Sequence, residues 1–104
     1  MDQLTELGKL QDNALRASGL LKSMANEWRL MILCQLIQGE ASVGELERIT
    51  GLRQSALSQH LAILRRERLV KTRRSAQTIY YSIDSDEAVA IVQTLYSLFC
   101  ADKT

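Results

Sequence analysis

The chain has 104 residues, of which 46% are hydrophobic and 24% charged, and its formal net charge at pH 7 is +1. This length and composition predict a single globular domain with a modest core, spanning residues 1–104. No run of apolar residues is long enough to span a bilayer, and the acidic, amphipathic N-terminus is unlike a signal peptide, so we expect a cytoplasmic protein.

The first part of the chain predicts two helices. Leucines and small residues at helical spacing indicate a first helix over about Leu4–Met24. Asn26 is a typical N-cap for a second helix over about Glu27–Gln38, which Gly39 would end. Because apolar residues cover a wide arc of this second helix, we expect it to lie at the centre of the core.

Residues 42–69 predict a helix, a tight turn and another helix. Ser42 and Glu45 have the spacing of a capping box, which starts a helix at this point. Gly51 adopts positive φ at little cost and suits the end of that helix. This order is typical of a helix-turn-helix unit.

The second helix of this pair begins at Arg53 or Gln54, runs to Glu67, and sorts into two faces at 100° per residue. One face is apolar and can bury against a core. The other is small and polar, and it consists of Gln54, Ser55, Ser58, Gln59, Ala62, Arg65 and Arg66. Amides and hydroxyls can reach base edges and arginines can hold phosphates, so this face favours DNA binding. The alternative is an amphipathic surface helix with a solvated polar face.

Charge is concentrated in one segment. Between Leu52 and Ser75 lie seven basic residues and one acidic residue, a net charge of +6. The remainder of the chain carries six basic and eleven acidic residues, a net charge of −5. Segregated positive charge produces a field on one surface, which is typical of proteins that bind a polyanion. The charge pattern therefore favours a nucleic-acid partner.

The segment from Val70 to Ile83 alternates between polar and apolar residues and predicts two strands joined through Arg74–Gln77. The basic tip of this hairpin carries Arg73, Arg74 and Gln77. It would form a wing beside the helices that straddles the DNA backbone or reaches the minor groove. The alternative is an ordinary hairpin with solvated arginines.

Asp84 and Glu87 have the spacing of an N-cap for a last helix, which runs from Ser85 to about Cys100. Its apolar arc is broad, and a chain this short has limited internal surface to cover two long terminal helices. We therefore expect the first and last helices to pack across a two-fold axis. The resulting homodimer would reach two DNA half-sites about 34 Å apart.

The residues SVGELERITGLRQSALSQHLAILRRERLV, followed by RRSAQTIYYSI, resemble the ArsR/SmtB family of winged helix-turn-helix repressors. The resemblance covers nearly the whole chain. It implies a mainly α fold of five helices with a two-stranded β-hairpin wing, and a dimer that binds operator DNA until an inducer is sensed. The metal ligands of classical members, a Cys-x-Cys motif before the turn and Asp and His on the last helix, do not occur here. We therefore expect neither a metal site nor another cofactor.

Cys34 on the second helix and Cys100 at the end of the last helix resemble the metal-free BigR, SqrR and HlyU branch of that family. The resemblance implies that persulfides or oxidants bridge the two cysteines, through a disulfide or a longer polysulfide, and that DNA is then released. The helical projection places both cysteines at the rims of apolar arcs. The alternative is that each is a small buried hydrophobic side chain.

Three other functions stay open on the sequence. A thiophilic-metal-responsive repressor could use both cysteines, although two ligands fall short of a tetrahedral site. A small thiol enzyme would need an activated cysteine, but there is no C-x-x-C motif, and the single histidine, His60, lies on the predicted DNA-reading helix. A winged helix used only for protein contacts would bind its partner without the salt dependence typical of DNA.

Overall fold

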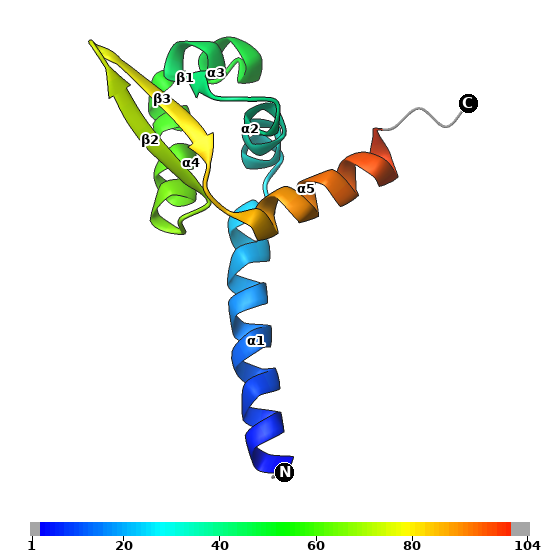
Figure 1. Cartoon of the computed structure of the whole chain (residues 1–104). Coiled ribbons are helices and arrows are strands. Elements are labelled where there is room, and N and C mark those ends of the chain that lie inside the picture. The colour runs from blue at the N-terminus through cyan, green and yellow to red at the C-terminus, as the bar shows by residue number, and fades with distance from the viewer. Residues whose placement is uncertain (1–2, 101–104) are drawn as a thin grey trace.

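The computed structural model describes residues 3–100, and their side chains from residue 5 onward. Within this range the chain forms five helices and three strands (Figure 1). In order they are α1 (Gln3–Met24), α2 (Glu27–Ile37), β1 (Ala41–Ser42), α3 (Val43–Thr50), α4 (Gln54–Arg66), β2 (Val70–Ser75), β3 (Thr78–Ile83) and α5 (Asp86–Phe99). The predicted winged helix-turn-helix fold is confirmed, with one short strand more than the sequence indicated.

Local signals at the helix ends act as predicted in three places. The Asn26 side chain accepts two backbone N–H groups from the first turn of α2. Ser42 Oγ accepts the N–H of Glu45 at 3.1 Å, while the Glu45 carboxylate accepts the N–H of Ser42 at 3.2 Å. Gly51 ends α3 with a φ of 72°, in the left-handed region that glycine favours. These caps fix where α2 and α3 start and where the turn to α4 lies.

The prediction that Asp84 caps the last helix is wrong. Ser85 is the N-cap, because its Oγ accepts the N–H of Ala88 at 3.1 Å. Asp84 instead donates its backbone N–H to the Leu69 carbonyl at 2.9 Å, which ties the end of β3 to the start of β2. The helix begins one residue later than expected, and Cys100 is its C-cap.

Strand β1 was not predicted, because two residues are too few to show an alternating pattern. It pairs antiparallel with the middle of β3, with Ala41 opposite Tyr81 and Ser42 opposite Tyr80. The sheet has the order β1-β3-β2. Ser42 therefore serves both as the last residue of this strand and as the cap of α3, which attaches the helix-turn-helix directly to the wing.

The turn of the wing is tighter than expected. Strands β2 and β3 pair up to Ser75 opposite Thr78, so that only Ala76 and Gln77 form the turn. Ala76 has a φ of 55°, at the position where a type II′ turn requires positive φ. Arg74, which we expected in the turn, lies on β2.

The core lies between α2, α3 and α4 on one side and the sheet on the other. Its largest fully buried side chains come from all three helices and are Ile32, Leu33, Leu46, Leu57 and Leu64. Each contributes about 1.5–3 kcal/mol relative to an exposed position. Helix α2 contacts α1, α3, α4, α5 and β3, which confirms its predicted central place.

Two helices extend from this body as arms in different directions (Figure 1). Large apolar side chains are exposed along both of them, and these are Leu7, Leu10, Leu15 and Leu21 on α1 and Tyr96, Leu98 and Phe99 on α5. The radius of gyration is 16.2 Å, whereas a compact domain of this length has about 13 Å. None of the described helices combines the length and the apolar character needed to cross a membrane.

Candidate nucleic-acid interface and thiol pair

The polar face of α4 is open to solvent. All of the side chains on it that were predicted to contact DNA are exposed, namely Gln54, Ser55, Ser58, Gln59, Arg65 and Arg66. The opposite face buries Leu57, Leu61 and Leu64, none of which exposes more than 2% of its surface. The predicted division of α4 into a buried face and a polar outer face is confirmed.

Buried polar contacts hold the turn between α3 and α4. Thr50 Oγ1 donates to the carbonyl of Leu46 at 2.7 Å and accepts the N–H of Leu52 at 3.2 Å. Thr50 itself is buried, so these contacts are shielded from water. Arg53 follows as the N-cap of α4 and makes no side-chain cap, as its residue type predicts. The contacts of Thr50 in the turn, and not a side-chain cap, therefore fix where α4 begins and how its outer face is oriented.

On the wing, Arg73 is already engaged by other side chains. Its Nε and Nη2 each lie 2.6 Å from an oxygen of the Glu40 carboxylate. Its guanidinium carbon lies 4.4 Å from the centre of the Tyr80 ring. The hydrogen bond from Arg73 lowers the pKa of Glu40, and the same bond raises the pKa of Arg73. The other two predicted wing residues, Arg74 and Gln77, are exposed and are not held by a carboxylate in this way.

A groove of about 610 Å³ lies between α4 and the hairpin. Its walls are Val43, Gln54, Ser58, Leu61, Ala62, Arg65, Arg66, Ile79 and Tyr81. Four of the side chains predicted to contact DNA therefore border one groove, with polar groups from α4 on one wall and apolar groups from β3 on the other. Arg74 and Gln77 do not line the groove and lie toward the tip of the wing.

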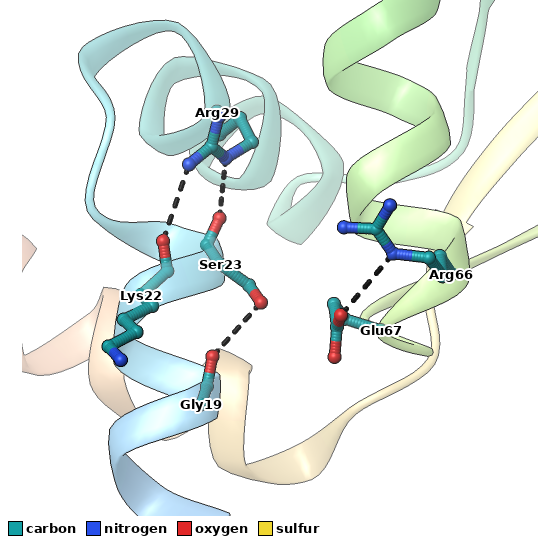
Figure 2. Close-up of polar contacts among 6 residues, drawn as sticks. All are labelled: Gly19, Lys22, Ser23, Arg29, Arg66 and Glu67. Atoms are coloured by element: carbon teal, nitrogen blue, oxygen red, sulfur yellow. Dashed lines mark hydrogen bonds and ion pairs between the residues drawn. The ribbon is translucent and has the colours of Figure 1, made fainter.

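Two further basic residues of the segment have acidic neighbours. Arg66 Nε lies 3.4 Å from Glu67 Oε1 at the end of α4 (Figure 2), and Lys71 Nζ lies 3.9 Å from Asp84 Oδ1. All four side chains are solvent-exposed, by 44–71% of their surface, and such surface pairs contribute about 0–1 kcal/mol, so a phosphate can replace the carboxylate at little cost. Within residues 5–100, four basic residues of this segment have no carboxylate within 4.0 Å, and these are Arg53, Arg65, Arg68 and Arg74.

Two exposed thiols belong to helices that pack against each other. Cys34 lies on α2 and Cys100 caps the C-terminus of α5. Partial burial raises the pKa of the Cys34 thiol, and the charge of a Cys100 thiolate raises it further. Cys34 is therefore within electrostatic range of Cys100. Both are exposed, as the helical projection predicts, rather than buried among apolar side chains.

The two residues that hold Arg73, Tyr80 and Glu40, were not predicted from the sequence. Tyr80 stands directly opposite Arg73 in the hairpin register, so a correct register would have predicted their contact. Glu40 precedes β1 and is separated from Arg73 by 33 positions, and no local pattern links two such residues. Among the described residues there is no group of three or more His, Cys, Asp or Glu side chains that could hold a metal ion.

Comparison with known proteins gives consistent results. A family model described as "Bacterial regulatory protein, arsR family" matches residues 26–72. The transcriptional activator HlyU of Vibrio cholerae is 52% identical over 94 residues, covering 90% of this chain and 87% of that protein. A biofilm growth-associated repressor of Agrobacterium fabrum is 44% identical over 97 residues, covering 93% of this chain and 83% of the repressor.

Solved structures agree over most of the chain. Reduced HlyU from Vibrio cholerae has a TM-score of 0.87 at 52% identity, covering 89% of this chain and 98% of the other. The transcriptional repressor BigR from Xylella fastidiosa has a TM-score of 0.83 at 40% identity, covering 91% of this chain and 97% of the other. The resemblance seen in the sequence is therefore confirmed: the chain belongs to the ArsR family of bacterial regulatory proteins, and it is a regulator rather than an enzyme.

Proposed function

We propose that this protein is a thiol-responsive transcription regulator that binds operator DNA as a homodimer when reduced and is released when Cys34 and Cys100 become bridged. The observation that carries the proposal is a pair of exposed thiols on two helices that pack against each other, in a regulatory fold that also presents a basic polar helix face. The relatives support the regulatory role, since HlyU is named a transcriptional activator and BigR a transcriptional repressor.

The DNA contacts divide between α4 and the wing. The small polar face of α4 suits the major groove, where Gln54, Ser55, Ser58 and Gln59 would meet base edges. At the C-terminal end of α4, Arg65 and Arg66 would hold phosphates, and on the wing Arg74 and Gln77 would contact the adjacent backbone. Arg73 would contribute less, because its guanidinium is shared with a carboxylate.

The two arms support the dimer. Leu15 exposes 75% of its surface on α1 and Phe99 exposes 80% on α5, which is unfavourable in water for a whole row of such side chains. A second copy of the chain, related by a two-fold axis, would cover both arms and present two reading helices to one duplex. Each protomer would then read one half-site.

The proposed switch needs only the two cysteines and an oxidant. One thiolate attacks a peroxide oxygen and becomes a sulfenic acid, while the rest of the peroxide leaves as hydroxide or alkoxide. The second thiolate attacks the sulfenic sulfur and expels hydroxide, so the two thiols lose the two electrons that reduce the peroxide. An organic persulfide can instead transfer its outer sulfur to a cysteine thiolate and leave as a thiolate, and a second molecule can do the same at the other cysteine. One protein persulfide then attacks the cysteine-bound sulfur of the other and expels hydrosulfide, which leaves a trisulfide bridge.

Bridging would join α2, in the body, to the end of α5, in an arm. This link changes the position of one reading helix relative to the other, because the arms set how two protomers are joined. A coupling of about 1–3 kcal/mol between the thiol state and the DNA affinity is typical of such systems and is enough to release DNA.

A gel shift with parallel mass measurement tests this function. The probe is a duplex from the region upstream of the protein's own coding sequence, incubated with protein plus reductant, peroxide or an organic persulfide. We expect a shifted band with reductant and its loss with either oxidant, together with an intact mass that shows two hydrogens lost or sulfur gained. Cys34→Ser and Cys100→Ser should both stay bound under all conditions. Release of Cys34→Ser like the wild type would refute the thiol switch, and the absence of any shifted band would refute DNA binding.

A further inference from the structure

Arg29, at the start of α2, directs its guanidinium group toward the end of α1 (Figure 2). Its Nε donates to the Ser23 carbonyl at 2.6 Å, and its Nη2 donates to the Lys22 carbonyl at 3.3 Å. Carbonyl groups in the last turn of a helix have no partner within the helix, and positive charge is favourable at this end. Arg29 therefore closes the C-terminus of α1 from a neighbouring helix.

The third nitrogen of the same guanidinium lies against α4. Arg29 Nη1 is 3.4 Å from Nδ1 of His60, which lies half-buried on the inner side of that helix. Because arginine can only donate, Nδ1 must accept, and the ring must be neutral with its proton on Nε2. Burial lowers the pKa of His60, and the positive charge of Arg29 lowers it further, so that the neutral ring is favoured at pH 7.

We infer that Arg29 positions the reading helix α4 on the arm helix α1, and that neutral His60 is the acceptor that completes this link. The inference rests on the proposed function, which assigns α4 to DNA and α1 to the dimer. All three guanidinium nitrogens have acceptors on two other helices. This planar fork is a geometry that the single ammonium group of lysine cannot reproduce.

The link should respond to pH through one proton. Protonation of His60 Nδ1 removes the accepting lone pair and places a second positive charge beside the guanidinium, so the contact between α2 and α4 is lost. Helices α1, α2 and α3 and strand β2 pack against α4, and among their described residues Arg29 is the charged group that shifts the pKa of His60. His60 is the one histidine in the sequence, so no other side chain has an ordinary pKa between pH 5 and 8.

The same proton affects folding stability in a defined direction. Since the pKa of His60 is lower in the folded than in the unfolded chain, the unfolded chain takes up the proton first as the pH falls. The contribution of neutral His60 to the free energy of unfolding is therefore fully present above about pH 6.5. It declines as the pH falls below this value, until the folded-state pKa is passed.

The test measures duplex affinity against pH by fluorescence anisotropy, with reduced protein and the upstream duplex described above. We expect wild-type affinity to fall by about fivefold between pH 7.5 and pH 5.5. His60→Gln keeps an acceptor that does not titrate, so its affinity should match the wild type at pH 7.5 and stay within about twofold down to pH 5.5. Arg29→Lys keeps the charge and loses the fork, so we expect binding weakened by about five- to tenfold at pH 7.5.

A second measurement needs no DNA and separates this inference from the proposed function. The NMR titration of the His60 ring should give a higher pKa in Arg29→Gln than in the wild type, because a positive charge has been removed. A wild-type affinity that falls with pH in parallel with His60→Gln, or an Arg29→Lys variant that binds like the wild type, would overturn the inference while DNA binding stands. Absence of wild-type duplex binding would overturn the proposed function and the role given to α4, and an unchanged His60 titration would then overturn the link as well.

Discussion

The body of the molecule and its two arms treat apolar side chains in opposite ways. In the body, Leu33, Leu46 and Leu57 are completely buried among helices α2, α3 and α4. On the arms, Leu15 exposes 75% of its surface and Phe99 exposes 80%. The body buries its large apolar side chains within one chain, whereas the arms leave large apolar side chains exposed.

This difference divides the proposed function between the two regions. The reading helix and the wing belong to the body, because their inner faces pack into its core. In the proposed dimer the arms would hold the second copy, and α5 carries one of the two cysteines at its end, so a thiol signal in the arms would change how two bodies are joined. Substitutions in the body should therefore act on folding and DNA contact, and substitutions in the arms on assembly.

The largest effect should come from the core of the body. Leu57→Ala removes a fully buried side chain of α4 and should lower the free energy of unfolding by about 2–5 kcal/mol, measured by urea denaturation. Ser58→Ala, its exposed neighbour on the same helix, should change that free energy by no more than about 0.5 kcal/mol. Equal losses in both variants would contradict the predicted faces of α4.

On the arms, a charge should prevent assembly. Leu10→Glu on α1 and Phe99→Glu on α5 should each raise the dimer dissociation constant by about 100-fold or more, equivalent to about 2.8 kcal/mol, measured by sedimentation equilibrium. Ile49→Glu is the matched control, because this side chain is a partly exposed hydrophobic residue on α3 in the body. A dimer that persists in both arm variants and dissociates in the control would reverse the roles of the two regions.

Within the wing, the neighbouring residues Arg73 and Arg74 should differ in how much they contribute to the salt dependence of DNA binding. Arg74→Gln should reduce the slope of log affinity against log salt by about 0.9 per protomer, the effect of one lost phosphate contact. Arg73→Gln should reduce it by clearly less, because the Arg73 guanidinium already binds the Glu40 carboxylate through two 2.6 Å contacts. Identical slopes in the two variants would show that the ion pair opens on DNA and leaves Arg73 fully available.

The smallest expected effect is on the pH dependence of Cys34 reactivity. Because burial and the Cys100 charge raise the pKa of Cys34, its alkylation by iodoacetamide should increase with pH and reach its midpoint above the ordinary value of about 8.5. Cys100→Ser removes the neighbouring charge, so the midpoint should move to lower pH. Site-resolved mass spectrometry measures both curves, and an unmoved midpoint would mean that the two thiols do not interact.

Local chemistry made much of the body predictable. Ser42 with Glu45, Gly51 and Asn26 mark helix ends through contacts within a few residues, and each occupies the predicted position. The same kind of signal was misassigned at the last helix, where Asp84 and Ser85 are adjacent and both residue types cap helices well. Only the tertiary hydrogen bond of Asp84 to Leu69 shows which of the two remains outside the helix.

Contacts between distant segments were not predictable in this way. Strand β1 exists because Ala41 and Ser42 lie beside β3, and nothing in two residues signals a strand. Glu40 meets Arg73 across 33 positions, and Arg29 meets His60 across 31. Such pairs depend on how the elements pack, so the side chains that position the wing and the reading helix could not be predicted from the sequence. The candidate DNA-contacting residues of α4 could be, because they follow from the helical period of one segment.

The most direct test of DNA binding by the basic face is the salt dependence of wild-type binding. Reduced protein is titrated onto the upstream duplex over a range of salt concentrations, and log affinity is plotted against log salt. With Arg65, Arg66 and Arg74 of each protomer on phosphates, we expect a slope of about −5 for the dimer. A slope near zero would contradict a phosphate-binding role for α4 and the wing.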